Sequence, residues 1–310
     1  MVFPILLKCS VIIPTRDRNA LLLRAVRSAL AALPQNSEVI VVDDGSTVPA
    51  SEVLTGINDN RLSVLRSECP MGYGGSPARN IGAKNARGQI LFFLDDDDEL
   101  ITDYVSHVLA SAVSQGADFG FAARKILRNG RNGRKRIKVE DRMLCEGFIV
   151  NSSCFKRRAF PFSAGFWIKR VAYDAIGPMS ERLVTNSDTD YCCRLYSSDL
   201  QGWYSPLPAI ITYEDEVGSS GQLGHLTKRA NAADRASAFK QIANSNDLLM
   251  RLDPCATLFI YARLIKYGVR SGRVAEVKEA LAEVQHFKAR LSLLFYVLVL
   301  SALFRNAHKQ

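Results

Sequence analysis

The sequence lacks several features that mark common protein classes. It has seven cysteines, and none of them forms a C-x-x-C pair, which argues against a structural zinc site and against a disulfide framework. Buried thiols in a reducing compartment are the expected alternative. There is no internal repeat and no low-complexity segment, so the composition is that of an ordinary folded protein.

The sequence also lacks an apolar run of the length that a membrane span needs. The N-terminal stretch MVFPILLKCSVIIPT has no basic start and no small-residue cleavage site, so we interpret it as leading into a strand and not as a signal peptide. The apolar run 291–304 would form a helix of about 21 Å, short of a bilayer core of about 30 Å. Its basic flanks are Lys288, Arg290, Arg305 and Lys309. A helix packed in the protein, an interfacial anchor and a true span are the alternatives.

Charge of one sign is in excess, because 40 Lys and Arg face 31 Asp and Glu, a formal net charge of +9. This balance favours anionic partners such as nucleic acid, an acidic membrane surface or a phosphorylated substrate. Eight Lys and Arg and no acid lie within 124–138, where two Asn-Gly pairs predict a hairpin turn. This basic hairpin is either a solvated turn or a contact for anionic groups such as lipid headgroups. Aromatic residues are not interleaved with its charges, so we expect no nucleic-acid partner.

The pattern of apolar residues predicts an α/β fold. Continuous apolar runs at 9–15, 37–46, 61–67 and 88–96 are typical of buried strands. Apolar residues at helical spacing within 20–33 predict a helix between the first two strands. Such alternation, with strands apolar on both faces, indicates a mostly parallel sheet covered on both sides. Ligands bind these sheets beyond the carboxyl ends of the strands.

Acidic residues cluster at these strand ends. Asp43 and Asp44 end the second strand, and four consecutive aspartates, Asp95–Asp98, end the fourth. Adjacent carboxylates repel each other, but side chains two apart on an extended chain point to the same side, so Asp95 and Asp97 can converge. Carboxylate oxygens, with substrate phosphates, are ligands that Mg²⁺ and Mn²⁺ prefer. The sequence therefore predicts either a metal site or an acidic turn that starts the next helix.

Four segments with recognisable motifs occur in order along the chain: SVIIPTRDR, VIVVDDGS, GGSPARNIGAKNARGQILFFLDDDDEL and SERLVTNSDTDYCCRL. Together they resemble the family 2 nucleotide-sugar glycosyltransferases of the GT-A fold, over about residues 8–215. The resemblance implies a Rossmann-like α/β fold, with a mostly parallel central sheet flanked by helices and a C-terminal α-helical extension. It implies a catalytic domain at 1–215 and a helical region at 216–310, in which 291–304 is a possible membrane-associating helix.

The resemblance also implies which residues bind the nucleotide-sugar donor. They lie at strand ends and in the ARNIG segment: Pro14, Thr15, Asp17, Asp44, Arg79, Asn80 and Asp96. Asp44 matches the position that contacts the base, commonly uracil, although by itself it is equally well explained as a turn residue. The family's D-x-D motif maps onto the four aspartates, with Asp95 and Asp97 as metal ligands and Asp96 on the ribose side. Asp98 is expected to begin the next helix.

A catalytic base is implied at Asp188, where the family has a Glu-Asp pair at the start of a helix. Here the residue before it is Ser187, so the familiar second acid is absent. Asp190 is the rival base, and helix capping is the alternative role of Asp188. Some relatives add a histidine metal ligand after this helix. Glu216 stands at that place, and His225, a few residues later, is a candidate substitute.

The activity implied by the resemblance is that of a metal-dependent, inverting glycosyltransferase of hexosyltransferase type, with Mn²⁺ or Mg²⁺ as cofactor. The expected donor is a UDP-sugar. The expected acceptor is a glycan or a polyprenyl-diphosphate-linked hydroxyl in bacterial surface polysaccharide synthesis. The basic surface and the apolar tail favour a cytoplasmic protein that associates peripherally with an anionic membrane surface, the inner face of the plasma membrane.

Two other functions fit parts of the pattern. A nucleotidyltransferase on a related α/β fold would have a Gly-rich, basic loop directly after the first strand, but PTRDRNALLL contains no glycine. A non-catalytic, nucleotide-sugar-binding, membrane-associated protein would not need both the four aspartates and Asp188. The absence of glycine from this loop counts against the nucleotidyltransferase, and the four aspartates together with Asp188 favour the transferase over a non-catalytic protein.

Overall fold

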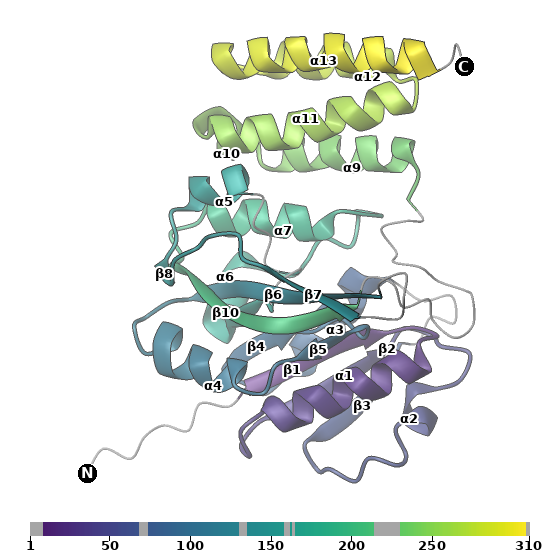
Figure 1. Ribbon diagram of the computed structural model, residues 1–310, viewed down its shortest axis with the longest axis vertical. Helices are drawn as coiled ribbons and strands as arrows, with labels where there is room; N and C mark the ends of the chain where they lie inside the picture. The colour runs from purple at the N-terminus through teal and green to yellow at the C-terminus, as the bar shows by residue number, and fades with distance from the viewer. Residues whose placement is uncertain are drawn as a thin grey trace. The chain divides into compact units, whose positions relative to one another are not determined.

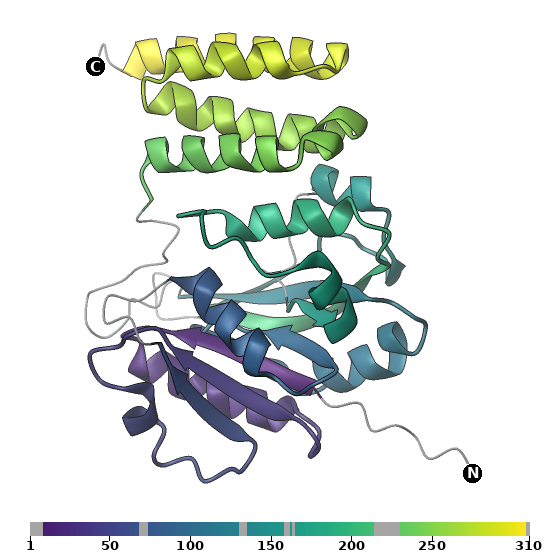
Figure 2. The ribbon, with the colours of Figure 1, turned by 180° about the vertical axis from the view of Figure 1, so that it is seen from behind.

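The computed structural model describes residues 9–67, 74–129, 135–157, 162, 165–213 and 230–307. The chain divides into two compact units, whose elements Figures 1 and 2 show from opposite sides. The first unit is drawn from 1–150, 159–179 and 199–223, and the second from 151–158, 180–198 and 224–310. Each unit is therefore discontinuous in the sequence. The domain boundary expected after residue 215 stays a prediction.

The first unit contains the central sheet. Its strand order is β3-β2-β1-β4-β9-β6-β10-β5, and β7 pairs with β6 while β8 pairs with β10. The strands are β1 Cys9–Thr15, β2 Glu38–Asp43, β3 Leu62–Arg66, β4 Ile90–Phe93, β5 Asp98–Leu100, β6 Phe119–Asn129, β7 Lys135–Glu140, β8 Gly147–Phe148, β9 Trp167–Lys169 and β10 Gly202–Tyr213. Parallel pairs join β3, β2, β1 and β4, and also β6 and β10. The predicted α/β fold with a mostly parallel central sheet is confirmed.

Helices lie on both faces of this sheet, as a comparison of Figures 1 and 2 shows for α1 and α3. The helical elements of the unit are α1 Asn19–Ala32, α2 Ala50–Val53, α3 Gly75–Asn85, α4 Tyr104–Val108, its π-helical continuation Leu109–Val113, and α6 Arg170–Ile176. Successive side chains of β2 point to opposite faces. Accordingly, Val39 and Val41 belong to the same core cluster as the buried face of α1, whereas Ile40 and Val42 pack with Ala78 of α3.

The approach of α3 to the sheet depends on one glycine. A Cβ atom at Gly82 would lie 2.4 Å from Cγ2 of Ile12, a distance at which one of the two elements must move. Glycine therefore lets α3 pack closely against β1. Because Arg79 and Asn80 lie three and two residues before Gly82 on α3, this contact also fixes the position of the helix segment that carries them.

The second unit is helical. Its helices are α5 Asn151–Arg157, α7 Ser187–Tyr196, α9 Ala232–Ser245, α10 Asp247–Leu252, α11 Pro254–Arg270, α12 Val274–Glu283 and α13 Phe287–Ala307. The central one is α11, which packs against α9, α12 and α13. It begins where sequence rules expect, because the Asp253 carboxylate caps the backbone N–H of Cys255 and Ala256, and proline occupies its first turn. The predicted helical C-terminal region is confirmed.

The apolar run 291–304 lies within α13. One side of this helix is buried, with Ala289 and Leu293 each 1% exposed. Another side is exposed, so α13 is packed against the protein on one side only. Among the helices of the described segments, none combines the length and the apolarity that crossing a bilayer requires.

Candidate active site

The four aspartates follow β4 but are not part of it. β4 ends at Phe93, and the backbone N–H of Asp98 donates to the carbonyl oxygen of Asp95 at 3.1 Å, which closes a turn. The chain then enters β5, where Asp98 is paired with Thr212 of β10. Asp95 and Asp97 do converge, as expected, but through this turn and not along an extended strand. The expectation that Asp98 begins the next helix is wrong, because Asp98 lies in β5 and the next helix, α4, begins at Tyr104.

The turn brings three carboxylates together. One oxygen each of Asp95, Asp97 and Asp98 lies within 4.8 Å of the other two. Carboxylate oxygens are the ligands that Mg²⁺ and Mn²⁺ prefer, so Asp95, Asp97 and Asp98 are the residues that would hold such an ion. Burial, together with the charges of Asp95 and Asp97, raises the pKa of Asp98 well above its usual range. The donor set thus fits a hard divalent cation, whose charge would offset this repulsion.

Arginines supply positive charge to the same acids. Nη1 of Arg18 lies 2.9 Å from Oδ1 of Asp96 and 3.0 Å from Oδ2 of Asp97, and the guanidinium group is largely buried. Arg79 forms an ion pair with Asp95. Sequence reasoning assigned Arg79 to the donor site but missed Arg18, although four adjacent carboxylates do signal that cations must lie nearby. The acidic turn is therefore a charge-compensated cluster.

Asp96 connects this turn to the end of β1. It is buried, and its Oδ2 accepts a hydrogen bond from Oγ1 of Thr15 at 2.7 Å. Burial raises the pKa of Asp96 to about 7, against the opposing effect of the Arg18 charge. Thr15 and Asp96 were both predicted to bind the donor, and the structure brings them into direct contact.

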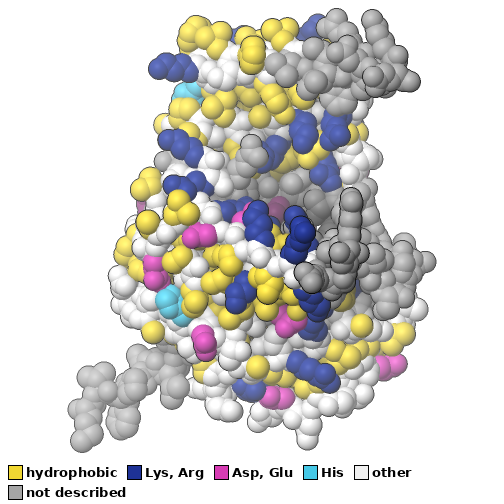
Figure 3. All heavy atoms as spheres, viewed as in Figure 1, with side chains coloured by type: hydrophobic (Ala, Val, Ile, Leu, Met, Phe, Trp, Pro, Cys, Tyr) yellow, Lys and Arg dark blue, Asp and Glu magenta, His cyan; other side chains and the backbone are white. Residues whose placement is uncertain are grey.

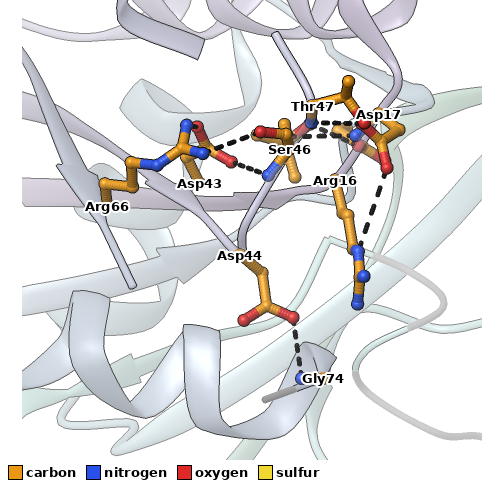
Figure 4. Close-up of polar contacts among 10 residues, drawn as sticks. Arg16, Asp17, Asp43, Asp44, Ser46, Thr47, Arg66 and Gly74 are labelled. Carbon is orange, nitrogen blue, oxygen red and sulfur yellow. Dashed lines mark hydrogen bonds and ion pairs between the residues drawn. The ribbon is translucent and has the colours of Figure 1, made fainter. Parts of the chain in front are cut away.

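The two aspartates at the end of β2 point in different directions (Figure 4). The Asp43 carboxylate accepts hydrogen bonds from the backbone N–H of Ser46 and Ala50 and from Nη1 of Arg66, at 2.7 to 2.9 Å. It therefore shapes the loop after β2. The Asp44 carboxylate is directed away from this network and accepts from the backbone N–H of Gly74 at 2.7 Å. Its predicted contact with a nucleotide base stays a prediction.

Asp17 joins the loops that follow β1 and β2. Its backbone adopts a positive φ of 53°, its N–H donates to Oγ of Ser46 at 3.0 Å, and its Oδ1 accepts from the N–H of Thr47 at 2.7 Å. Pro14 lies beside it in buried β1, opposite Val42 in the register with β2. The two residues lie at the carboxyl end of β1, and their contact with a nucleoside stays a prediction.

Asn80 has a different neighbourhood from Arg79. Its Oδ1 accepts from the N–H of Met179 and from the Tyr173 hydroxyl, and its Nδ2 donates to the Met179 carbonyl at 2.9 Å. These bonds tie the loop after α6 to α3. Of the residues predicted for the donor and metal, the acidic turn thus gathers Thr15, Arg79, Asp95, Asp96 and Asp97. The contacts described above for Asn80, Asp17 and Asp44 lie elsewhere in the first unit.

The predicted base, Asp188, belongs to the second unit. It is half-buried in the first turn of α7, and its Oδ1 accepts from the N–H of Thr189 at 2.8 Å. Asn186 occupies the N-cap position but makes no side-chain cap hydrogen bond, whereas Asp188 accepts from a first-turn N–H, so the capping alternative for Asp188 stays open. Asp190 is buried, contacts Nε of Arg194 at 3.2 Å and accepts from Nδ2 of Asn246 at 3.2 Å. These contacts give Asp190 a structural role. Glu216 and His225 lie outside the described residues.

The basic hairpin is described only in its strands, because 130–134 lie outside the described residues. β6 and β7 pair in antiparallel fashion, with Arg128 opposite Arg136. Glu140 compensates Arg124 at the base of this pair, at 2.7 Å. Lys and Arg side chains gather on the face where β6 and β7 lie (Figures 1 and 3). Repulsion between the facing arginines favours an anionic contact there.

Comparison with known proteins identifies the family. Residues 10–177 match the model of glycosyl transferase family 2. The chain is 34% identical over 108 residues to a GalNAc(5)-diNAcBac-PP-undecaprenol beta-1,3-glucosyltransferase of Campylobacter jejuni. This match covers 34% of each chain. Over 113 residues the chain is 29% identical to the UDP-Glc:alpha-D-GlcNAc-diphosphoundecaprenol beta-1,3-glucosyltransferase WfaP of Escherichia coli, covering 36% of this chain and 44% of the relative. The chain spans less than half the length of the curated relatives it matches.

A solved structure with the same fold is that of TarS residues 1–349 from S. aureus in complex with UDP-GlcNAc. The TM-score is 0.70, and the match covers 97% of this chain and 92% of that one. The identity of 17% makes this a likeness of fold. The family match over more than half of the chain, together with the GT-A architecture and the acidic turn after β4, confirms the resemblance predicted from the sequence. The chain belongs to glycosyl transferase family 2.

Proposed function

We propose that this protein is a metal-dependent, inverting glycosyltransferase that moves a sugar from a UDP-sugar to a hydroxyl of a lipid-linked acceptor. The observation that carries the proposal is the acidic turn, where carboxylates of Asp95, Asp97 and Asp98 meet within 4.8 Å at the ligand-binding edge of the sheet. These three residues would hold Mn²⁺ or Mg²⁺. When bound, the cation supplies Lewis-acid stabilisation of the charge on the departing diphosphate.

The residues around the turn suit an anionic donor. Arg18 and Arg79 lie against the aspartates and carry the fixed positive charges of the site. A diphosphate is a stronger bidentate partner for such guanidinium groups than a single carboxylate oxygen is. Asp44, Asp17 and Pro14, at the neighbouring strand ends, are the proposed contacts of the nucleoside. The complex of TarS with UDP-GlcNAc supports a UDP-linked donor on this fold.

Asp188 is the proposed base. It takes the proton from the acceptor hydroxyl as the hydroxyl oxygen forms a bond to the anomeric carbon and the bond from that carbon to the diphosphate breaks. One displacement with one base inverts the anomeric configuration. The burial of Asp190 and its contacts with Arg194 and Asn246 argue against Asp190 as the base and so favour Asp188.

The acceptor is proposed from chemistry and from likeness. WfaP and the Campylobacter enzyme are named for acceptors carried on diphospho-undecaprenol. An acceptor of that kind is a glycan attached to a diphosphate and a lipid, and it lies at a membrane surface. A net charge of +9 and the facing cations of β6 and β7 suit it. We therefore propose surface polysaccharide synthesis at the cytoplasmic face of the plasma membrane, with peripheral association.

Calorimetric titration with UDP and GDP, with and without Mn²⁺, tests the donor and the metal together. UDP should bind at least about tenfold more tightly when Mn²⁺ is present, because a cation held by Asp95, Asp97 and Asp98 would supply positive charge for the diphosphate. The Asp97→Asn variant should lose this gain, and Asp174→Asn, an exposed acid on α6, should retain it. Absence of binding by either nucleotide, or binding that ignores the metal, would overturn the proposal.

The base is tested by Asp188→Asn. Transfer should fall by about a thousandfold or more while the affinity for UDP stays within about twofold, because the base acts only on the acceptor. The matched control is Asp247→Asn, an exposed acid in an i,i+4 ion pair on α10, which should keep its transfer rate. Rates with saturating acceptor and UDP titrations give the two numbers. A loss of UDP affinity in Asp188→Asn would assign this residue to the donor instead.

A further inference from the structure

The exposed side of α13 carries a stripe of large apolar side chains. Their exposed fractions range from 43% to 75%: Phe287, Leu291, Leu294, Phe295 and Leu298. At about 100° per residue, this spacing confines the five side chains to an arc of about 100° on the helix surface. Hydrophobic side chains are visible along this helix in Figure 3. They form one continuous surface, which we call the α13 stripe.

The α13 stripe is separate from the core of the second unit. The core-facing side of the helix is formed by Ala289 and Leu293, and α13 packs against α11 and α12. Those contacts hold the helix in place, so the stripe is not needed for the fold. Contiguous exposed apolar surface is unusual on a soluble protein and marks a binding surface for another apolar phase.

The charges beside the stripe indicate what that phase is. Lys288 and Arg290 are exposed, and their positions on the helical wheel place them on opposite sides of the stripe, about 20° and 40° beyond its edges. The sequence contains no acid after Glu283, but four Lys and Arg follow it. An apolar stripe bordered by cations is the arrangement in which lysine and arginine reach lipid phosphates while neighbouring side chains enter the acyl region.

We propose that α13 binds flat to the surface of an anionic lipid bilayer through this stripe. The proposal deepens the proposed function, on which its biological reason rests, because a lipid-linked acceptor lies at such a surface. Charge decides against a second copy as the occupant. Two stripes packed on each other would bring Lys288 and Arg290 toward the cations of the partner helix, with no acid of α13 between them. Anionic headgroups neutralise the same cations.

Co-sedimentation of the full chain with vesicles tests the proposal. Vesicles of phosphatidylcholine with 30% phosphatidylglycerol are compared with pure phosphatidylcholine, in the absence of any donor or acceptor. The protein should partition onto the anionic vesicles, and Leu291→Ser/Phe295→Ser should reduce the partition coefficient about tenfold or more. Lys288→Gln/Arg290→Gln should reduce it by a similar factor on anionic vesicles only, and added salt should remove that difference.

The matched control is Leu248→Ser/Leu252→Ser, which removes from α10 of the same unit two leucines, one about as exposed as Phe295 and the other slightly more exposed, and both more exposed than Leu291. This variant should partition as the unchanged protein does, and melting curves should show all variants folded. Equal losses in the control and the stripe variant would overturn the proposal. So would equal binding to both vesicle types, or a dimer in light scattering that only the stripe variant abolishes. Because no nucleotide is present, failure here would leave the UDP titration unaffected, and the reverse also holds.

Discussion

Asp43 at the end of β2 and the aspartates after β4 look alike in the sequence, since each group follows an apolar run and precedes a turn. Their partners differ in kind. Asp43 is satisfied by two backbone N–H groups of its own loop and by Arg66. The acids after β4 instead have one another as neighbours, and their positive partners are arginines from α3 and from the start of α1. Backbone N–H groups are fixed in place, whereas arginine side chains can rotate to other partners. Asp43 therefore holds its loop in shape, and the acids after β4 are able to exchange their arginine partners for another cation.

The largest expected effect in this comparison is that of substituting Asp98, the acid that the sequence assigned to the start of a helix. Asp98→Asn should lower metal-dependent transfer by about a thousandfold, the scale expected when one charge-stabilising group is lost. Transfer rates over a range of Mn²⁺ concentrations measure it. Asp103→Asn, an exposed acid in the same connection, is the control. An unchanged rate in Asp98→Asn would place the metal site elsewhere.

The same variant makes a prediction about pH without any metal. The raised pKa of Asp98 means that the folded protein loses stability as the pH rises through that pKa, because charging the buried carboxyl is unfavourable. Asp98→Asn removes this loss. Its melting temperature should therefore exceed that of the unchanged protein at pH 8, and the advantage should shrink toward pH 5, where Asp98 is more fully protonated. Melting curves at the two values check the sign.

Substitution of Asp43 at the end of β2 should lower the stability of the fold, whereas Asp98→Asn should raise it. Asp43→Asn should destabilise the fold by about 3 kcal/mol, because an amide cannot accept from all three donors and leaves a buried N–H without a partner. Urea denaturation measures the difference. Asp44→Asn, one residue along, keeps the Asp43 network and should cost about 1 kcal/mol or less. Equal costs would mean that the loop does not depend on Asp43.

The smallest effect compares the arginines that serve the two ends. Arg18→Met should cost about 2 kcal/mol without metal, since it leaves the acids of the turn less compensated. Arg66→Met removes a half-exposed partner and should cost about 1 kcal/mol or less. Mn²⁺ should then raise the melting temperature of Arg18→Met more than that of the unchanged protein. A Mn²⁺ shift in Arg66→Met of the same size would break the comparison.

Much of the fold could be predicted from the sequence because its signals are local. The apolar runs that became β1, β2 and β3, and the helical period of α1, are readable within a few residues. The sequence predicted where the acidic residues cluster, but it did not predict the turn that brings their carboxylates together. Asp98 is fixed by a bond to the Asp95 backbone and by pairing with β10, and Arg18 reaches Asp96 across 78 positions of sequence. Spacing rules do not encode the long-range pairing of Asp98 with β10 or the reach of Arg18 to Asp96, so the roles of both residues were missed.

The discontinuity of the two units has a consequence for how the chain is made. α5 and α7 are synthesised well before α9 and α11, the helices with which they form a unit. The buried carboxylate of Asp190 acquires its Asn246 partner only after a further 56 residues have been added. During synthesis, α7, the helix that carries Asp188, therefore lacks its packing partners until α9 and α11 have been made. A fragment ending near residue 215 would leave that helix without α9 and α11, so we expect such a fragment not to hold the proposed base in place.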